Sequence, residues 1–323
     1  MIENNPELNK VLQPLYSRLR RQVFTQELSR KSLVFIFGND KIKKTYTFSL
    51  PAGWSCPGAL TCLSKADRFK GGVTDGPQAQ FRCFAASEEC RLTEVRMIRW
   101  HNFELLKAAL QVSISETTNL ILSALPQDAK TVRVHVSGDF FSESYFLAWL
   151  EVARLRPDIH FYGYTKSIPT LLKYRDQMPT NFRFVASLGS RFDNLILTNN
   201  LKHSIVIKSD AEADALGLEI DHDDSHAMYG EKSFALVIHA AQPKGSDWAI
   251  AWESLRRAKE NANKAKGPKR SRPETTTAQW IKRILKMVVR LIAAGGRLTQ
   301  EDAVLVNGLT FNAGVVLPSP VMA

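Results

Sequence analysis

The chain has 323 residues, a formal net charge of +11 and a pI near 9.5. This length can bury a large core, and a hydrophobic fraction of 44% is ordinary for a globular protein. No run approaches 18 uninterrupted apolar residues, which argues against a membrane-spanning helix. The start, MIENNPELNK, lacks the basic and apolar segments of a signal peptide. We therefore expect a cytoplasmic protein with no membrane partner.

The positive charge favours a polyanionic partner, because clustered Lys and Arg release counterions from phosphates. Between Arg256 and Glu274 there are eight Lys or Arg residues and two Glu residues. Such a stretch is typical of a segment that becomes ordered on a nucleic acid. We expect a nucleic-acid partner, DNA in preference to RNA, and the alternative is a soluble protein that is simply basic.

The predicted elements begin with an amphipathic helix over residues 7–31, followed by a β-hairpin whose turn is Gly38-Asn39-Asp40. A helical stretch over 95–125 then leads into alternating strands and helices. The predicted strands span 132–136, 159–164, 182–188, 203–209 and 233–240, with helices over 143–155 and 169–177. This rhythm predicts an α/β fold with a parallel sheet. We expect a (β/α) barrel, complete or incomplete. A doubly wound open sheet is second, because no strand is followed by a glycine-rich dinucleotide fingerprint.

The rhythm stops after residue 245, where a helix near 247–263 and a second helix over 275–296 are predicted. The second helix has one apolar face, and Lys282, Arg283, Lys286 and Arg290 lie largely outside it. It is equally typical of a docked helix and of a nucleic-acid-binding element. We expect three segments: a helix and hairpin (1–50), a cysteine-rich segment with the catalytic core (51–245), and a basic helical extension (246–323).

All four cysteines fall within 35 residues: Cys56, Cys62, Cys83 and Cys90. In a reducing compartment, clustered cysteines more often bind metal than form disulfides. Their spacing, C-x₅-C-x₂₀-C-x₆-C, permits a metal site without identifying the ion, since four thiolates suit zinc or an iron–sulfur cluster. We expect zinc, with an iron–sulfur cluster as the alternative, in an otherwise irregular segment.

Polar residues follow several predicted strands, at the edge of a parallel sheet where active sites lie. In "VRVHVSGDFF", Val132, Val134 and Val136 would share one face and Arg133 and His135 the other, with Ser137-Gly138-Asp139 at the strand end. We expect Asp139, Asp193 and His135 to be catalytic. The candidate substrate-binding residues are Ser137, Gly138, Phe140, Tyr164, Lys166, Ser187, Arg191 and His239. The alternative is that Asp139 or Ser142 only caps the next helix.

The motifs "SLPAGWSCPGALTC", "CFA", "RWHNFELL" and "VHVSGDFFSESYFLAWLEVA" resemble the phage and plasmid family known as gene product 88, from about residue 45 to 195. The resemblance implies a mobile-element origin, and it marks Cys56, Cys62, Cys83 and Ser137-Gly138-Asp139 as recurrent features. Members of that family often carry Asp where this chain has Val136. The family name implies no activity.

Two enzyme families offer further likenesses. Guanine transglycosylases are zinc-binding barrels with an Asp-Ser-Gly-Gly-Phe strand end, which "VSGDFF" resembles. This likeness implies exchange of guanine for a deazaguanine in DNA, with Asp139 and Asp193 as nucleophile and proton-handling group. Radical S-adenosylmethionine enzymes are similar in carrying cysteines after the first barrel strand and Gly-Gly-Glu after the second, but their C-x₃-C-x₂-C signature is absent here. Base exchange is our first expectation. The iron–sulfur enzyme is the second, and a non-catalytic DNA-binding or host-takeover protein is the third.

Overall fold

The computed structural model describes residues 4–38, 42, 44–265, 275–293 and 295–313. The chain forms two compact units. We call residues 1–31 with 268–323 the helical unit, and residues 32–267 the sheet unit. These units divide the chain differently from the three expected segments, because helices from the two ends of the chain pack together.

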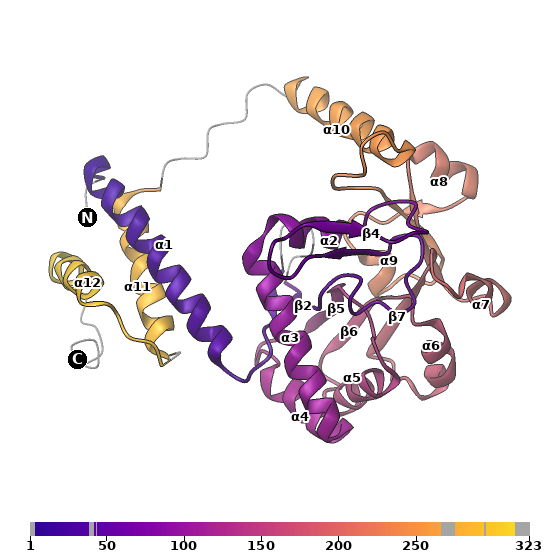
Figure 1. Cartoon of the computed structure of the whole chain (residues 1–323), viewed down its shortest axis with the longest axis horizontal. Helices are drawn as coiled ribbons and strands as arrows, with labels where there is room; N and C mark the ends of the chain where they lie inside the picture. The colour runs from indigo at the N-terminus through magenta and orange to yellow at the C-terminus, as the bar shows by residue number, and fades with distance from the viewer. Residues whose placement is uncertain (1–3, 39–41, 43, 266–274, 294, 314–323) are drawn as a thin grey trace. The chain divides into compact units, whose positions relative to one another are not determined.

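The helical unit contains α1 (Pro6–Ser29), α11 (Thr277–Ala293) and α12 (Gln300–Ala313). Figure 1 shows α1 and α11 lying side by side. Their apolar faces meet in one core, which includes Leu15, Leu19, Ile284 and Val288. Both amphipathic helices predicted from the sequence are present. Burial of these apolar residues shows that α11 is docked through its apolar face, while its basic residues stay exposed.

The sheet unit is built on an eight-stranded sheet with the order β1-β2-β5-β6-β7-β8-β10-β9. Its strands are β1 (Ile36–Phe37), β2 (Tyr46–Ser49), β5 (Thr131–Ser137), β6 (His160–Thr165), β7 (Phe182–Ser187), β8 (His203–Ile207), β9 (Glu219–Ile220) and β10 (Phe234–Val237). Among the described strands of this sheet only the β1–β2 pair is antiparallel, and it forms the predicted hairpin. Asn39 and Asp40 of its expected turn lie outside the described residues.

The six long parallel strands, β2 to β10, lie beside one another in chain order. This is the order of a barrel, and it lacks the central reversal of a doubly wound sheet. The short β9 adds to the outer side of β10, and no pairing joins β9 to β1 within the described part of the chain. The parallel sheet is therefore present, whereas a closed barrel is not confirmed.

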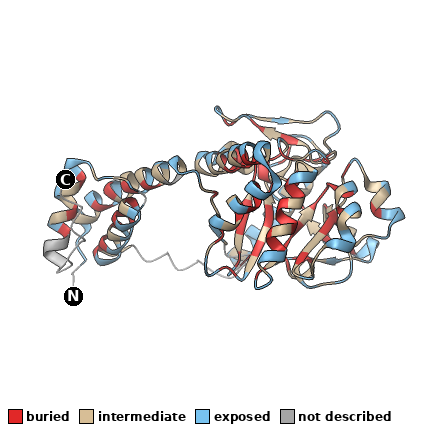
Figure 2. Cartoon of the chain, turned by 90° about the horizontal axis from the view of Figure 1, so that it is seen from below, coloured by how far each residue is buried: buried red, intermediate tan, exposed pale blue. Residues whose placement is uncertain are grey.

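Helices α3 (Thr93–Val112), α4 (Ile114–Ala124) and α5 (Glu143–Leu155) cover one face of the sheet. The main core lies between them and the strands, where Phe48, Val134, Trp149 and Phe161 are fully buried. Figure 2 shows this concentration of buried residues on the strands and on the inner faces of the helices. Helix α5 begins where predicted, because the Ser142 hydroxyl accepts a hydrogen bond from Tyr145 N at 3.2 Å.

The remaining elements are shorter. In the cysteine-rich segment, β3 (Ser64–Ala66) and β4 (Val73–Asp75) form a small hairpin before α2 (Phe84–Arg91). Helices α6 (Ile168–Tyr174), α7 (Asp193–Thr198), α8 (Asp210–Leu216) and α9 (Ser225–Met228) follow successive strands, and α10 (Asp247–Ala265) ends the described part of the unit. Residues 266–274 of the predicted basic stretch lie outside the description. None of the described helices combines the length and the hydropathy needed to cross a membrane.

Candidate functional site

The carboxyl ends of the parallel strands are covered by the segment that carries the first two cysteines. We call residues 50–63, between β2 and β3, the cysteine loop. Leu50 N donates to the carbonyl of Ser137 at 2.8 Å, and Leu60 N donates to the carbonyl of Gly189 at 3.1 Å. The cysteine loop thus contacts the turns that follow β5 and β7. It follows β2, which is parallel to those strands, so all three segments lie at the same edge of the sheet.

The turn Ser137-Gly138-Asp139 is shaped by this contact. Gly138 has φ of +86°, a conformation that favours glycine. A Cβ atom at this position would lie 2.5 Å from the hydroxyl of Ser55 and 2.6 Å from Cβ of Leu50. Glycine at this position lets another group come close to the backbone, and the group that does so is the chain's own cysteine loop.

Asp139 is buried at the junction of β5 and β6. Its Oδ1 accepts from the Thr165 hydroxyl at 2.6 Å and from Phe140 N at 2.7 Å, and its Oδ2 accepts from Lys166 N at 2.7 Å. Burial raises the pKa of this carboxyl to about 6, although the hydrogen bonds act in the opposite direction. Asp139 therefore holds the ends of two neighbouring strands in register beside the cysteine loop.

Three thiols and this carboxyl are close enough to influence one another. Burial raises the pKa of Cys56 well above its usual value, and the negative charges of Asp139, Cys83 and Cys62 add to that effect. Burial and the neighbouring Cys62 raise the pKa of Cys83 to about 12, against hydrogen bonds from the backbone of Ala85 and Ala86. In the described residues, no three His, Cys, Asp or Glu side chains meet the geometry of a metal site as they stand.

Cys90 stands apart from the other three thiols. It follows Cys83 by seven residues along α2, which separates their Cα atoms by about 10 Å. It is not among the leading influences on the pKa of Cys56 or Cys83, and it acts instead on Arg82. The structure therefore groups Cys56, Cys62 and Cys83, and the four-cysteine site remains a prediction.

Glu89 is a site residue that sequence reasoning missed. It is fully buried, and its Oε1 accepts from Ala52 N at 2.8 Å, from Arg99 Nη1 at 2.9 Å and from the Ser137 hydroxyl at 3.2 Å. These bonds join α2, α3, the cysteine loop and the end of β5. On a short charged helix a glutamate is normally a surface residue, and only "RWHN" in the family motif marked the neighbourhood of its partner Arg99.

His135 and Phe140 lie in the main core, contrary to the expected strand alternation. The β2–β5 register shifts after Phe48, so that Phe48 pairs with Val134 and Ser49 with Ser137. His135 consequently packs against Phe48 and Phe140, and its Nε2 lies 2.9 Å from the Tyr145 hydroxyl. Burial lowers the pKa of His135 to about 3. The shared face expected for Arg133 and His135 is therefore wrong.

Asp193 lies at the start of α7, where both of its oxygens are engaged. Its Oδ2 accepts from Gly189 N at 2.9 Å and its Oδ1 accepts from Ser190 N at 2.8 Å. These bonds fix the turn after β7. The neighbouring Arg191 has an exposed side chain, and its backbone N–H donates to the carbonyl of Gly58 in the cysteine loop at 2.9 Å. Arg191 is thus available to a ligand, whereas Asp193 shapes the loop.

Lys166 and Ser187, two of the candidate substrate-binding residues, contact each other. The buried Lys166 ammonium donates to the Ser187 hydroxyl at 2.8 Å and to the Ser187 carbonyl at 3.1 Å. A further bond goes to the carbonyl of Leu188. This ammonium places a positive charge between the carboxyl ends of β6 and β7, and the backbone N–H of the same residue binds Asp139.

Tyr164 and His239 lie in two different surroundings. Arg133 lies over the Tyr164 ring and forms a 2.6 Å ion pair with the buried Asp224, on the face of the sheet that α9 covers. The exposed His239 packs its ring 4.3 Å from that of Phe84, the first residue of α2. His239 therefore lies near the helix that begins after Cys83, and Tyr164 belongs to a separate polar network.

These features define an α/β protein with a thiol-bearing loop at the carboxyl edge of a parallel sheet. The chain belongs to the gene product 88 family, since the sequence model of that family matches residues 22–266. It is 29% identical over 140 residues to the gene 88 protein of Mycobacterium phage L5, covering 40% of this chain and 51% of that one. It is 30% identical over 141 residues to the gene 88 protein of Mycobacterium phage D29, covering 40% and 50%.

The chain thus spans about half the length of the curated relatives it matches. No solved structure matches it. This match confirms the resemblance to the gene product 88 family that the sequence motifs indicated. The matched region extends beyond those motifs on both sides.

Proposed function

We propose that this chain is an iron–sulfur enzyme that uses S-adenosylmethionine. One observation carries the proposal: Cys56, Cys62 and Cys83 lie between the first and second parallel strands, where the Ser64 hydroxyl bonds both the Cys62 carbonyl and Cys83 N, and the cysteine loop packs on Gly138 at the end of the second strand. Radical S-adenosylmethionine enzymes place their cysteines and their Gly-Gly-Glu element at the same two strand ends. Six parallel strands in chain order fit the incomplete barrel of that class.

The donor set suits such a cluster by its chemistry, since it offers three thiols, while the positions of the described side chains as they stand do not meet the geometry of a metal site. Three thiolates hold an iron–sulfur cluster and leave one iron open, and they suit it better than four thiolates of which one stands two helical turns away. The thiol pKa values are raised by burial and by mutual repulsion, and a bound cation reverses both effects. When bound, the cluster supplies the electron for reductive cleavage of S-adenosylmethionine at its open iron.

The remaining residues of the site hold the surrounding elements in position or bind the ligand. Asp139, with each of its oxygens engaged, holds the ends of β5 and β6 together, and Glu89 holds α2 against the cysteine loop. Lys166 and Ser187 offer a cation and a hydroxyl at the next strand ends. The three N–H donors of the ammonium are taken by Ser187 and Leu188, so we assign to Lys166 the electrostatic attraction of the S-adenosylmethionine carboxylate. We assign to the Ser187 hydroxyl, which accepts from Lys166 and keeps its own proton, a hydrogen bond to that carboxylate.

Base exchange, the first expectation from the sequence, receives less support. That scheme needs one aspartate free to attack a sugar and a second free to handle protons. Asp139 accepts three hydrogen bonds and Asp193 accepts two, all but one of them from backbone N–H groups. Both carboxylates are engaged in holding loops, so the structure offers no free nucleophile from this pair.

The test is metal analysis of protein prepared without oxygen. We expect brown protein with about four iron and four sulfide per chain, and S-adenosylmethionine cleavage after reduction. Cys56→Ala, Cys62→Ala and Cys83→Ala should each lose the iron, whereas the matched variant Cys90→Ala should keep it. A colourless zinc protein in which Cys90→Ala loses metal like the other three would contradict the proposal and restore the four-cysteine zinc site.

A further inference from the structure

The positive charge of the chain is concentrated in the helical unit. Its 87 residues contain 14 Lys and Arg and 6 Asp and Glu, a net charge of +8. The 236 residues of the sheet unit contain 29 and 26, a net charge of +3. Most of the net charge of +11 therefore belongs to the part of the chain that carries no cysteine and no histidine. A function for this charge has to be sought in the helical unit itself.

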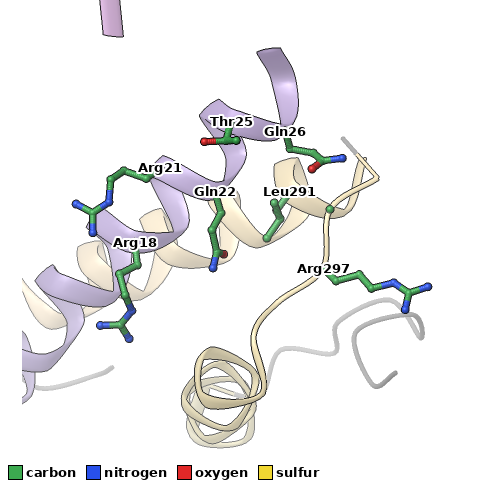
Figure 3. Close-up of a pocket in the computed structure, with 8 residues that line it drawn as sticks. Arg18, Arg21, Gln22, Thr25, Gln26, Leu291 and Arg297 are labelled. Carbon is green, nitrogen blue, oxygen red and sulfur yellow. The ribbon is translucent and has the colours of Figure 1, made fainter. Parts of the chain in front are cut away.

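A cleft of about 450 Å³ opens in this unit between α1 and the segment that follows α11. Figure 3 shows Arg18, Arg21 and Gln22 on α1 at one side and Arg297 at the other. No Asp or Glu lines the cleft. Figure 3 shows the Arg21 and Arg297 side chains extending to opposite sides of the cleft, and a lining with three arginines and no carboxylate favours an anionic ligand with several charges.

Arg18 is held in place by the buried Asp302 of α12. Its Nε and Nη2 donate to Asp302 Oδ1 at 3.1 and 2.7 Å, while 37% of its side chain remains exposed. The hydrogen bonds from Arg18 fix the guanidinium plane before any ligand arrives, which reduces the entropy lost on binding. Arg18 therefore presents its remaining N–H donors in a fixed orientation.

The other two arginines are not neutralised by neighbours. Arg21 and Arg297 are exposed, and neither forms an ion pair within the described part of the chain. Gln22 donates weakly to Asp302 at 3.4 Å, and its buried Oε1 has no hydrogen-bond partner in the described structure. A buried acceptor without a partner costs stability, so this atom is suited to a donor supplied by a ligand.

A membrane surface fits these observations less well than a nucleic acid does. Lipid-binding helices insert an apolar face, but the apolar face of α11 is buried against α1 through Ile284, Val288 and Leu291. An open cleft with several arginines and an unsatisfied acceptor suits a ligand that combines phosphates with hydrogen-bond donors. Nucleic acids have both, in the backbone and in the base or sugar groups.

We propose that the helical unit is a nucleic-acid-binding module whose cleft, lined by Arg18, Arg21, Gln22 and Arg297, binds the phosphodiester backbone. The inference does not rest on the proposed iron–sulfur chemistry, because every residue involved lies in the helical unit. It places the ligand contacts on α1 and on the segment after α11, rather than on the basic stretch 256–274 expected from the sequence.

The test uses the full chain and fluorescent 20-nucleotide single strands and duplexes of DNA and of RNA. The double variant Arg21→Ala/Arg297→Ala should lose about tenfold in affinity per arginine at 0.1 M salt, and the slope of log K against log salt should fall by about 2. Arg21→Lys/Arg297→Lys, which keeps both charges, should retain most of the slope. The DNA and RNA arms show which backbone is preferred.

The matched control is Lys107→Ala/Lys130→Ala, which removes the same charge from exposed positions of the sheet unit. It should change affinity less than threefold. Equal losses in both double variants would overturn the cleft as the site, as would unchanged binding in Arg21→Ala/Arg297→Ala. Binding to anionic phosphatidylserine vesicles without binding to any oligonucleotide would overturn the choice of ligand. Circular dichroism and thermal melting confirm that the variants remain folded.

Discussion

The two units of this chain differ in what they can do. The sheet unit has all four cysteines and all seven histidines, and its net charge is only +3. The helical unit has neither residue type, and it carries a net charge of +8 on α1, α11, α12 and the segments beside them. Groups that bind metal or transfer protons are thus separated from groups that attract phosphates. Electrostatic capture of a polyanion does not have to be built into a buried, thiol-containing site.

The distinction between the two units would not hold if they unfolded together as one cooperative unit. Phe48→Ala removes a fully buried ring that packs against Phe35 and Trp149, and should cost the sheet unit about 4 kcal/mol. Leu15→Ala should cost the helical unit about 3 kcal/mol. Segment-resolved hydrogen exchange should show protection lost in α5 but not α11 for Phe48→Ala, and the reverse for Leu15→Ala. Loss of protection in both helices for either variant would contradict independence.

The comparison becomes more precise at Glu89, a carboxylate that the sheet unit buries between several of its elements, while the helical unit buries a carboxylate of its own, Asp302. Glu89→Gln removes the charge that pairs with the buried Arg99 and should destabilise the sheet unit by about 3 kcal/mol. The neighbouring Glu88 also pairs with Arg99 but is 39% exposed, so Glu88→Gln should cost less than about 1 kcal/mol. Urea unfolding curves of the two variants measure the difference. Equal effects would show that burial of Glu89 is unimportant.

Lowering the pH should destabilise the sheet unit but not the helical unit, by less than the substitutions above. His135 is buried and its pKa is lowered to about 3, against 6.5 for an ordinary histidine. The neutral His135 ring stabilises the folded state fully above pH 6.5. This stabilisation is lost as the pH falls toward 3, because His135 in the unfolded chain takes up a proton at a higher pH than it does in the folded chain. At pH 5 the loss is about 2 kcal/mol.

Replacing His135 tests whether this ring causes the loss of stability between pH 7 and pH 5. In His135→Gln the difference in urea stability of the sheet unit between pH 7 and pH 5 should shrink by this amount. The exposed His222 gives a control, and His222→Gln should leave the difference unchanged. The helical unit, which has no histidine, should show no change from either variant. An unaltered pH dependence in His135→Gln would show that the ring is protonated equally easily in both states.

The sequence predicted the elements whose local signals agree with their packing. Helix α5 was predicted over 143–155 and found there, since Ser142 caps a helix most of whose apolar residues are buried in the core. The parallel strands β5, β6, β7, β8 and β10 were predicted from their β-branched and aromatic runs. Short elements such as β9 and α9 gave no periodicity to detect, and α12, which supplies Asp302, was not predicted.

The site was predicted less completely than the fold. The position of Ser137-Gly138-Asp139 at a strand end beside the cysteines followed from chain order, and the structure places it there. His135 was misplaced, because a register shift between β2 and β5 leaves no trace in an alternating sequence. Glu89 was missed and Cys90 could not be separated from the other thiols, since both depend on contacts between elements and not on spacing.

The pairing of α1 with α11 also determines when each unit can fold during synthesis. The sheet unit is complete once residue 267 has left the ribosome, and it can fold while translation continues. Helix α1 has to wait for a partner made more than 240 residues later, with the apolar stripe of Leu12, Leu15, Leu19 and Val23 uncovered. A nascent chain halted before Thr277 should therefore expose a binding site for a chaperone that the finished protein has closed.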